Sequence, residues 1–130
     1  MTSISLAAPW ASTPGHLNLS QTLAFHSQFR TPRSGPRHWE RLLLDAGLSV
    51  GDHVPVAAWS SGQRQRLSLA LALGSESQVV LLDEPATNLD AEGIQWLQDQ
   101  LNVISRDTLL VVATNDQKKE GFQGASILEV

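Results

Sequence analysis

Two adjacent carboxylates, Asp83 and Glu84, directly follow a short apolar run, Val79 to Leu82. A continuous apolar run of this length is typical of a strand buried on both faces of a parallel sheet. Ligands of open α/β sheets bind at the carboxyl ends of the strands, and burying two carboxylates there is costly unless something occupies the site. An Asp at this position can hold Mg²⁺, often through water, and the next Glu can polarise a nucleophilic water. The alternative interpretation is a strand that ends in an acidic turn, which is common.

A second candidate site lies upstream, where the segment Ser60-Ser61-Gly62-Gln63 precedes a run rich in Leu and Ala. Small residues at the N-terminus of a helix expose backbone N–H groups and hydroxyls, and the helix dipole adds about half a positive charge. The segment therefore predicts a seat for a phosphate group. The alternative is a loop of small residues that only caps a helix.

The elements that would position these groups follow from composition and periodicity. In the run Leu67 to Leu73 every residue except Ser68 is Leu or Ala, which predicts a helix that is buried nearly all round. Asp90 is expected to cap a helix whose apolar side chains share one face. The segment from Thr108 to Ala113 repeats the buried-strand pattern, and residues 126–130 are expected to form another strand. A strand, a helix and a strand joined by short links make a βαβ unit, so the fold class is α/β.

The first half of the chain is predicted to be helical. Asn18 and Gln21 make a capping box for a helix that carries Leu19, Leu23, Phe25 and Phe29. Pro36 is placed to open a second helix that Gly47 ends, and residues 48–63 are expected to form a loop. Residues 1–29 contain no Asp, Glu, Lys or Arg, and residues 4–9 resemble the end of a buried strand, which indicates that the chain starts in mid-domain. The expected division is a helical lobe over about residues 10–75 and an α/β core over about 76–130.

Composition excludes several classes of protein. The chain has 130 residues, 42% of them hydrophobic and 17% charged, which is one globular domain's worth of sequence. The absence of cysteine excludes disulfides and Cys-based metal sites. A net charge of -4 argues against a protein that coats nucleic acid, and no apolar stretch is long enough to span a bilayer.

The order of these features resembles the C-terminal part of an ATP-binding cassette (ABC) ATPase domain. The segment Trp59-Ser60-Ser61-Gly62-Gln63 resembles the signature motif of that family, Leu82-Asp83-Glu84-Pro85 resembles its Walker B strand with the catalytic glutamate, and Asn88-Leu89-Asp90 resembles its D-loop. The resemblance spans nearly the whole chain. It implies a partial P-loop NTPase-like parallel sheet core preceded by a helical subdomain.

The resemblance also implies roles for individual residues. Asp83 would anchor Mg²⁺, Glu84 would orient the attacking water, and Asn115 falls where the family has its switch histidine. The residues implied in nucleotide contacts across a dimer of cassettes are Ser60, Ser61, Gly62 and Gln63 toward the γ-phosphate bound on the partner, and Asn88 and Asp90 at the interface. The implied ligands are ATP and Mg²⁺.

The chain also departs from the family pattern. It contains no Gly-x-x-x-x-Gly-Lys-Ser/Thr segment, so the backbone cradle and the lysine that grip the β- and γ-phosphates are missing from these residues. The glutamine of the Q-loop is missing from the segment Ala7 to Trp10. Ser61 stands in place of a glycine and Trp59 in place of the common leucine.

These features predict a fragment of an ABC transporter ATPase that is inactive alone and carries an open sheet edge with exposed apolar surface. The implied partners are a second cassette and a transmembrane subunit, without nucleic acid, at the cytoplasmic face of a membrane. The rivals are a degenerate, non-catalytic half-cassette that serves as an interaction module, and a non-transport ABC protein that acts on ribosomes or DNA. Six arginines between Arg30 and Arg66 are interpreted as a solvated face or a subunit contact.

Overall fold

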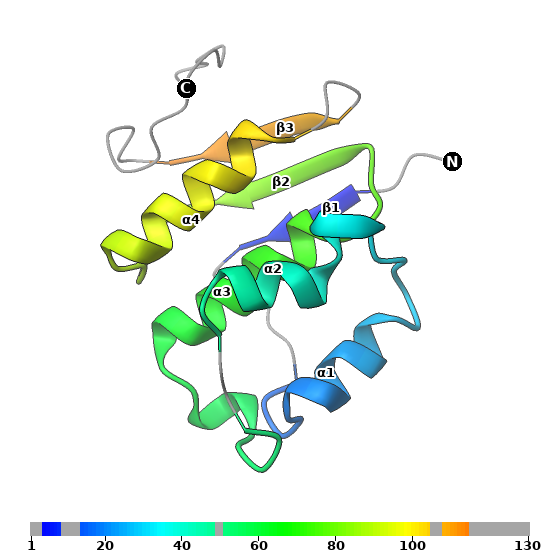
Figure 1. Ribbon diagram of the computed structural model, residues 1–130, viewed down its shortest axis with the longest axis vertical. Coiled ribbons are helices and arrows are strands. Elements are labelled where there is room, and N and C mark those ends of the chain that lie inside the picture. Colours follow the sequence, from blue (N-terminus) through cyan, green and yellow to red (C-terminus); the bar gives the residue numbers. More distant parts are fainter. Residues whose placement is uncertain (1–3, 9–13, 49–50, 105–107, 115–130) are drawn as a thin grey trace.

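The computed structural model describes residues 4–8, 14–48, 51–104 and 108–114. Its strands are β1 (Ile4–Ala7), β2 (Val79–Asp83) and β3 (Leu109–Ala113), and its helices are α1 (Leu19–His26), α2 (Trp39–Asp45), α3 (Ser61–Leu73) and α4 (Ala91–Asn102), with short 3-10 helices η1 (Gly35–Arg37) and η2 (Val56–Ala58). The strands form a parallel sheet in the order β1-β2-β3 (Figure 1). Ala7 pairs with Leu82, and Asp83 pairs with Ala113, so the three strands end at the same edge. The predicted α/β class is confirmed.

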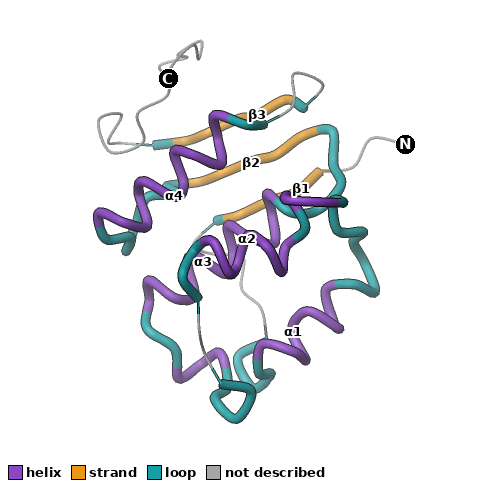
Figure 2. The backbone as a smooth tube through the Cα atoms, in the orientation of Figure 1, coloured by secondary structure: helices purple, strands orange, loops and turns teal. Residues whose placement is uncertain are grey.

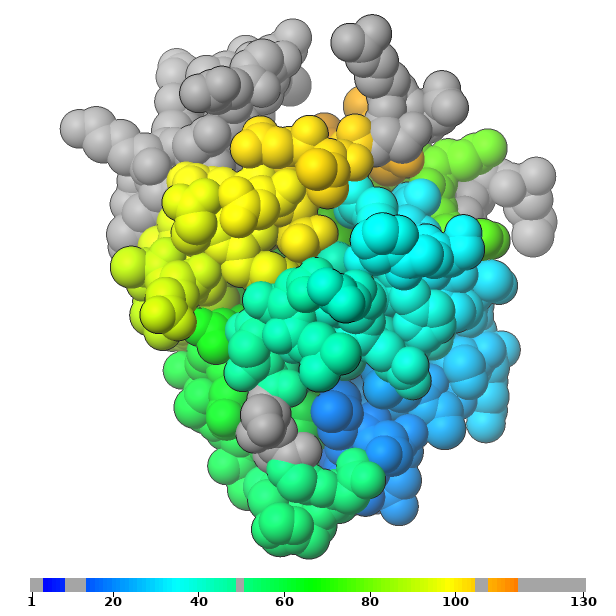
Figure 3. All heavy atoms as spheres, in the orientation of Figure 1, coloured from blue at the N-terminus to red at the C-terminus, as the bar shows by residue number. Residues whose placement is uncertain are grey.

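The helices cover one face of this sheet. Val80 and Leu82 of β2 point toward them and are fully buried in one apolar cluster with Trp39, Leu69 and Leu97. Figure 2 traces the path of the backbone, and Figure 3 shows α4 (yellow) beside the teal atoms of α2 on the visible side. The division into two lobes stays a prediction.

The opposite face of the sheet is open among the described residues. Alternate strand residues point to this face and keep large exposed fractions: 46% for Ile4, 36% for Leu6, 60% for Leu109 and 46% for Val111. The expectation that β2 is buried on both faces is wrong for the described structure: Val79 and Leu81 are only half-buried on this side, where no described element packs. The expected exposed apolar surface is confirmed.

Helix α3 begins earlier than predicted. The side chain of Ser60 accepts a hydrogen bond from the backbone of Gln63, and the side chain of Gln63 accepts one from the backbone of Ser60, which makes a capping box. The predicted loop over residues 48–63 is wrong at its end, because this capping box starts the helix at Ser61. The prediction that Leu67 to Leu73 is helical and buried, apart from Ser68, is confirmed.

In the first half, the capping box of Asn18 and Gln21 is confirmed. Helix α1 ends at His26, however, so Phe29 lies outside it with 69% of its surface exposed, and its expected place in the helix is wrong. Pro36 lies in η1, and α2 begins only at Trp39. The left-handed φ of +71° at Gly47 accounts for the predicted end of this helix.

The cap of α4 by Asp90 is confirmed by a hydrogen bond of 2.8 Å from the backbone N–H of Gly93. The strand expected over residues 126–130 lies outside the described residues. Within the part of the chain that the structure describes, no helix combines the length and apolar character that crossing a membrane requires.

Candidate functional site

The acidic turn begins at the end of β2, where Asp83 is the last strand residue and Glu84 leaves the sheet. Glu84 has a φ of +47°, a left-handed conformation that is uncommon for a residue with a side chain. Its backbone N–H donates a 2.7 Å hydrogen bond to the carbonyl of Ala113 in β3, which holds this conformation. Backbone strain of about 1–3 kcal/mol tends to persist at functional sites. Both carboxylates are half-buried at the edge where the strands end.

The turn continues through a compact segment, residues 84–90, which we call the acidic loop. The N–H of Thr87 donates to the carbonyl of Glu84 at 3.1 Å, and the N–H of Leu89 donates to that of Ala86 at 3.2 Å. Asn88 has a φ of +64°, a conformation that Asn accepts more readily than most residues. These bonds give the acidic loop a defined shape before α4 begins.

The signature-like segment forms the N-terminus of α3. In its capping box the Ser60 Oγ lies 3.1 Å from the Gln63 N, and the Gln63 Oε1 lies 2.9 Å from the Ser60 N. The Gln63 side chain and the Ser60 Oγ, as an acceptor, are thus used inside the segment, while Ser60 and Ser61 are both exposed. Exposed hydroxyls at a helix N-terminus are available to an anionic group from another molecule.

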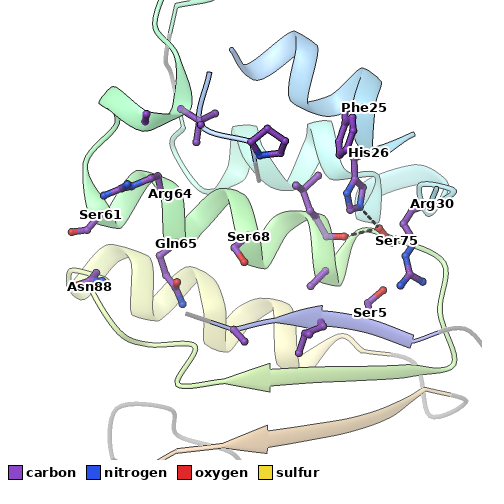
Figure 4. Close-up of a pocket in the computed structure, with 18 of the residues that line it drawn as sticks. Ser5, Phe25, His26, Arg30, Ser61, Arg64, Gln65, Ser68, Ser75 and Asn88 are labelled. Carbon is purple, nitrogen blue, oxygen red and sulfur yellow. Dashed lines mark hydrogen bonds between the residues drawn. The ribbon is translucent and has the colours of Figure 1, made fainter. Parts of the chain in front are cut away.

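The fold brings these two segments together. A Cβ at Gly62 would lie 2.9 Å from the carbonyl oxygen of Asn88, so the helix and the acidic loop touch at a position that has no room for a side chain. The Arg66 Nη2 lies 2.6 Å from the Asp90 Oδ1. Figure 4 shows Ser61 and Gln65 on α3 at the end of the helix near Asn88. The signature-like segment at the start of α3 and the acidic loop, which the sequence predicts separately, are therefore in direct contact.

Electrostatics keep Asp90 ionised. The hydrogen bond from the Gly93 N–H, followed by the attraction and hydrogen bond of the Arg66 guanidinium, holds the pKa of the Asp90 carboxyl below its ordinary value. Asp90 is therefore an anion at neutral pH, and it bonds to both α4 and α3.

The interpretation of the arginines as a solvated face is wrong for four of them: the Arg37 guanidinium is buried, and three others bind oxygen atoms of the chain. Arg30 donates to the carbonyl of Ile4, Arg33 donates to the carbonyls of Leu73 (3.2 Å) and Ser77 (3.0 Å), and Arg66 pairs with Asp90. These guanidiniums bind backbone and carboxylate oxygens of segments that are far from them in the chain. The local pattern of charges in the sequence does not indicate such partners.

Sequence reasoning also missed Gln65, whose Nε2 donates a 2.8 Å hydrogen bond to the carbonyl of Pro85. The signal available in the sequence was position: Gln65 and Arg66 lie two and three residues after the capping Gln63, close to the candidate phosphate seat. Asn115, the other predicted site residue, lies outside the described residues. Among the residues that the structure describes, no group of three or more His, Asp or Glu side chains could hold a metal ion by itself.

A groove of about 690 Å³ runs along α3, between α1 and β1 (Figure 4). Its far end holds His26, whose Nε2 lies 3.2 Å from the Ser75 Oγ, while that hydroxyl donates to the carbonyl of Leu71 at 2.6 Å. The hydroxyl therefore accepts its hydrogen bond from the His26 ring. Burial, and then the charge of Arg30, lower the pKa of His26.

The model of one protein family, described as ABC transporter, matches residues 10–87, which is more than half of the chain. The chain belongs to the ABC transporter family. A model described as DNA polymerase III, delta subunit matches residues 66–128, just under half of the chain.

Relatives agree with this membership. An uncharacterised ABC transporter ATP-binding protein of Haemophilus influenzae is 31% identical over 85% of this chain and 45% of its own length. The cytochrome c biogenesis ATP-binding export protein CcmA of Bordetella parapertussis is 44% identical over 55% of this chain and 31% of its own. A solved structure, an ABC transporter ATP-binding protein from Pyrococcus furiosus, has a TM-score of 0.69 at 14% identity and covers 87% of this chain and 56% of that one, which shows the fold. This ABC-family chain thus spans less than half the length of these curated relatives.

Proposed function

We propose that the chain is part of the ATP-hydrolysing subunit of an ABC transporter, in which Glu84 orients the attacking water and Asp83 helps to hold Mg²⁺. One observation carries this proposal: the signature-like start of α3 and the acidic loop are in direct contact, with Gly62 against the Asn88 carbonyl. Membership of a family of ATP-binding proteins supports the choice of ATP as the ligand.

The residues present fit Mg²⁺ as a shared ligand. Asp83 offers carboxylate oxygens, which this ion prefers, and Mg²⁺ is usually held by one or two carboxylates together with substrate phosphates and water. When bound, the ion neutralises charge on the transferred phosphoryl group. Glu84 follows Asp83 directly and can accept a proton from a water or align it for attack.

The exposed start of α3 is proposed to contact the nucleotide of a second cassette. Ser60 and Ser61 are exposed at the N-terminus of α3, where backbone N–H groups and hydroxyls can meet an anion. Asn88 and Asp90 are proposed to lie at the same dimer interface, where exposed residues of the acidic loop would meet the partner.

The phosphate cradle is proposed to come from residues other than these 130, because no P-loop sequence is present. The other proposed partners are that P-loop segment and a transmembrane subunit. Binding to such a subunit would place the chain at the cytoplasmic face of a membrane. The names of the relatives, such as an export ATP-binding protein, support transport over work on ribosomes or DNA.

Calorimetry with MgATP tests the proposal. We expect the 130-residue chain alone to show no binding in the micromolar range, and the complete ATPase that contains it to bind MgATP. Micromolar binding by the chain alone would mean that a phosphate site is built from residues not identified above. No binding by the complete protein would favour the degenerate interaction module.

A further inference from the structure

The first two turns of α3 are joined to the acidic loop at three points. Gly62 lies against the carbonyl of Asn88, Gln65 donates to the carbonyl of Pro85, and Arg66 pairs with Asp90. Each contact links a residue of the signature-like helix to a different part of the acidic loop. The loop is therefore fixed to α3 near its beginning, near its middle and at its end.

The Arg66 contact is specific in its geometry. Its side chain is only 17% exposed, its Nε is buried without a hydrogen-bond partner among the described residues, and its Nη2 holds the Asp90 carboxylate. Gly93 makes room for this arrangement, because a Cβ there would lie 3.2 Å from the Arg66 Nη2 and 3.1 Å from the Asp90 Oδ1. Asp90 itself is 67% exposed, so the pair contributes more to position than to stability.

The Gln65 contact lies next to the proposed catalytic carboxylate. Pro85, whose carbonyl accepts the 2.8 Å bond, is fully buried and follows Glu84 directly in the chain. Glu84 is held in its left-handed conformation on its other side by the carbonyl of Ala113. A displacement of the start of α3 would therefore act on the backbone one residue away from Glu84.

We propose that Gln65 and Arg66 are positioning residues that couple the signature-like start of α3 to Glu84 within the same chain. When Ser60 to Gln63 engage a partner's nucleotide, these two side chains carry the resulting shift of α3 to the acidic loop and set the place of the Glu84 carboxylate. Neither side chain needs to touch nucleotide. The kinetic part of this inference rests on the proposed function, whereas the coupling between the two segments does not.

Amide hydrogen exchange on the chain tests the coupling directly. The N–H groups of Thr87 and Leu89 are hydrogen-bonded inside the acidic loop, so their protection reports its order. We expect Arg66→Met to speed their exchange about threefold, as for the loss of a partly exposed ion pair, with a smaller effect in Arg66→Lys. Arg41→Met is the matched control, because it removes an exposed Arg–Asp pair on α2 and should leave both amides unchanged.

If Arg66→Met fails to fold, Asp90→Asn removes the same ion pair from the other side while keeping an acceptor for the Gly93 N–H. Gln65→Ala should likewise speed the exchange of Thr87 and Leu89. Unchanged exchange of both amides in the folded variants would overturn the proposal.

Steady-state hydrolysis by the complete ATPase separates positioning from binding. We expect Arg66→Met to lower kcat about tenfold, with KM for MgATP changed by less than about twofold, and Arg66→Lys to recover part of the rate. A raised KM with an unchanged kcat would overturn the positioning role. A wild-type assembly that hydrolyses no ATP would contradict the proposed function, and the exchange experiment would still decide the coupling.

Discussion

Replacing Gly62 with alanine tests the contact that joins the two halves of the site. Gly62 is the second residue of α3, and a Cβ at this position would lie 2.9 Å from the carbonyl oxygen of Asn88. That oxygen belongs to the backbone of a loop held by its own hydrogen bonds, and Asn88 already has a φ of +64°. The clash can therefore be relieved only by moving the acidic loop away from α3.

Two opposing effects decide whether Gly62→Ala raises or lowers the free energy of unfolding. Glycine to alanine within a helix ordinarily stabilises a protein by about 0.8–1.0 kcal/mol, whereas forcing an extra methyl group into a close contact costs about 1–3 kcal/mol. Because the obstacle is backbone and not a flexible side chain, we take a clash of about 2 kcal/mol, near the middle of that range. The net expectation is a loss of about 1 kcal/mol in the free energy of unfolding.

Urea denaturation followed by circular dichroism measures this difference. Ser61→Ala is the control, because Ser61 is the exposed neighbour on the same helical turn and has no such contact. We expect Gly62→Ala to lower the free energy of unfolding and Ser61→Ala to change it by less than about 0.5 kcal/mol. A gain of about 1 kcal/mol in Gly62→Ala, the plain helix-propensity effect, would refute the close approach of α3 to the acidic loop.

Three further predictions concern other sites. The Arg37 guanidinium is buried without a hydrogen-bond partner among the described residues, and burial and Arg33 lower its pKa, so Arg37→Met should raise the free energy of unfolding by about 1 kcal/mol in urea denaturation. Burial, and then the charge of Arg30, lower the pKa of His26 in the folded chain below its ordinary value of 6.5. The unfolded chain therefore takes up the proton first, so the free energy of unfolding should be constant above pH 6.5 and fall on acidification below it. Thermal unfolding scans should show a smaller fall in His26→Gln. Asparagine cannot become cationic, so hydrolysis by the complete ATPase should show no histidine-like titration near neutral pH, whereas Asn115→His should introduce one in a pH–rate profile.

Several elements could be predicted because their signals are local. The capping box of Asn18 and Gln21 depends on residues three positions apart, and the cap at Asp90 lies directly before its helix. The short apolar runs ending at Asp83 and Ala113 predict neighbouring parallel strands, since a βαβ link has a preferred geometry.

The parts that could not be predicted depend on distant or external groups. Ile4 and Leu6 are apolar, which predicts burial, but what packs on a sheet face is not encoded in the strand itself. The pairing of Arg66 with Asp90 joins residues 24 positions apart, and the charge pattern gives no reason to choose that partner. The bond from Gln65 to the Pro85 carbonyl is equally nonlocal and involves an uncharged side chain.

The most direct test of the central claim is ATP hydrolysis by the complete ATPase with Glu84→Gln, measured together with the nucleotide that stays bound. Glutamine keeps the shape and hydrogen bonding of the side chain but cannot act as a base. Glu92→Gln, in the first turn of α4, is the matched control because it removes an exposed carboxylate that lies outside the acidic loop. We predict that Glu84→Gln abolishes turnover and traps uncleaved ATP in a lasting dimer, while Glu92→Gln hydrolyses at the wild-type rate. Hydrolysis near the wild-type rate in Glu84→Gln would contradict the assignment of the site.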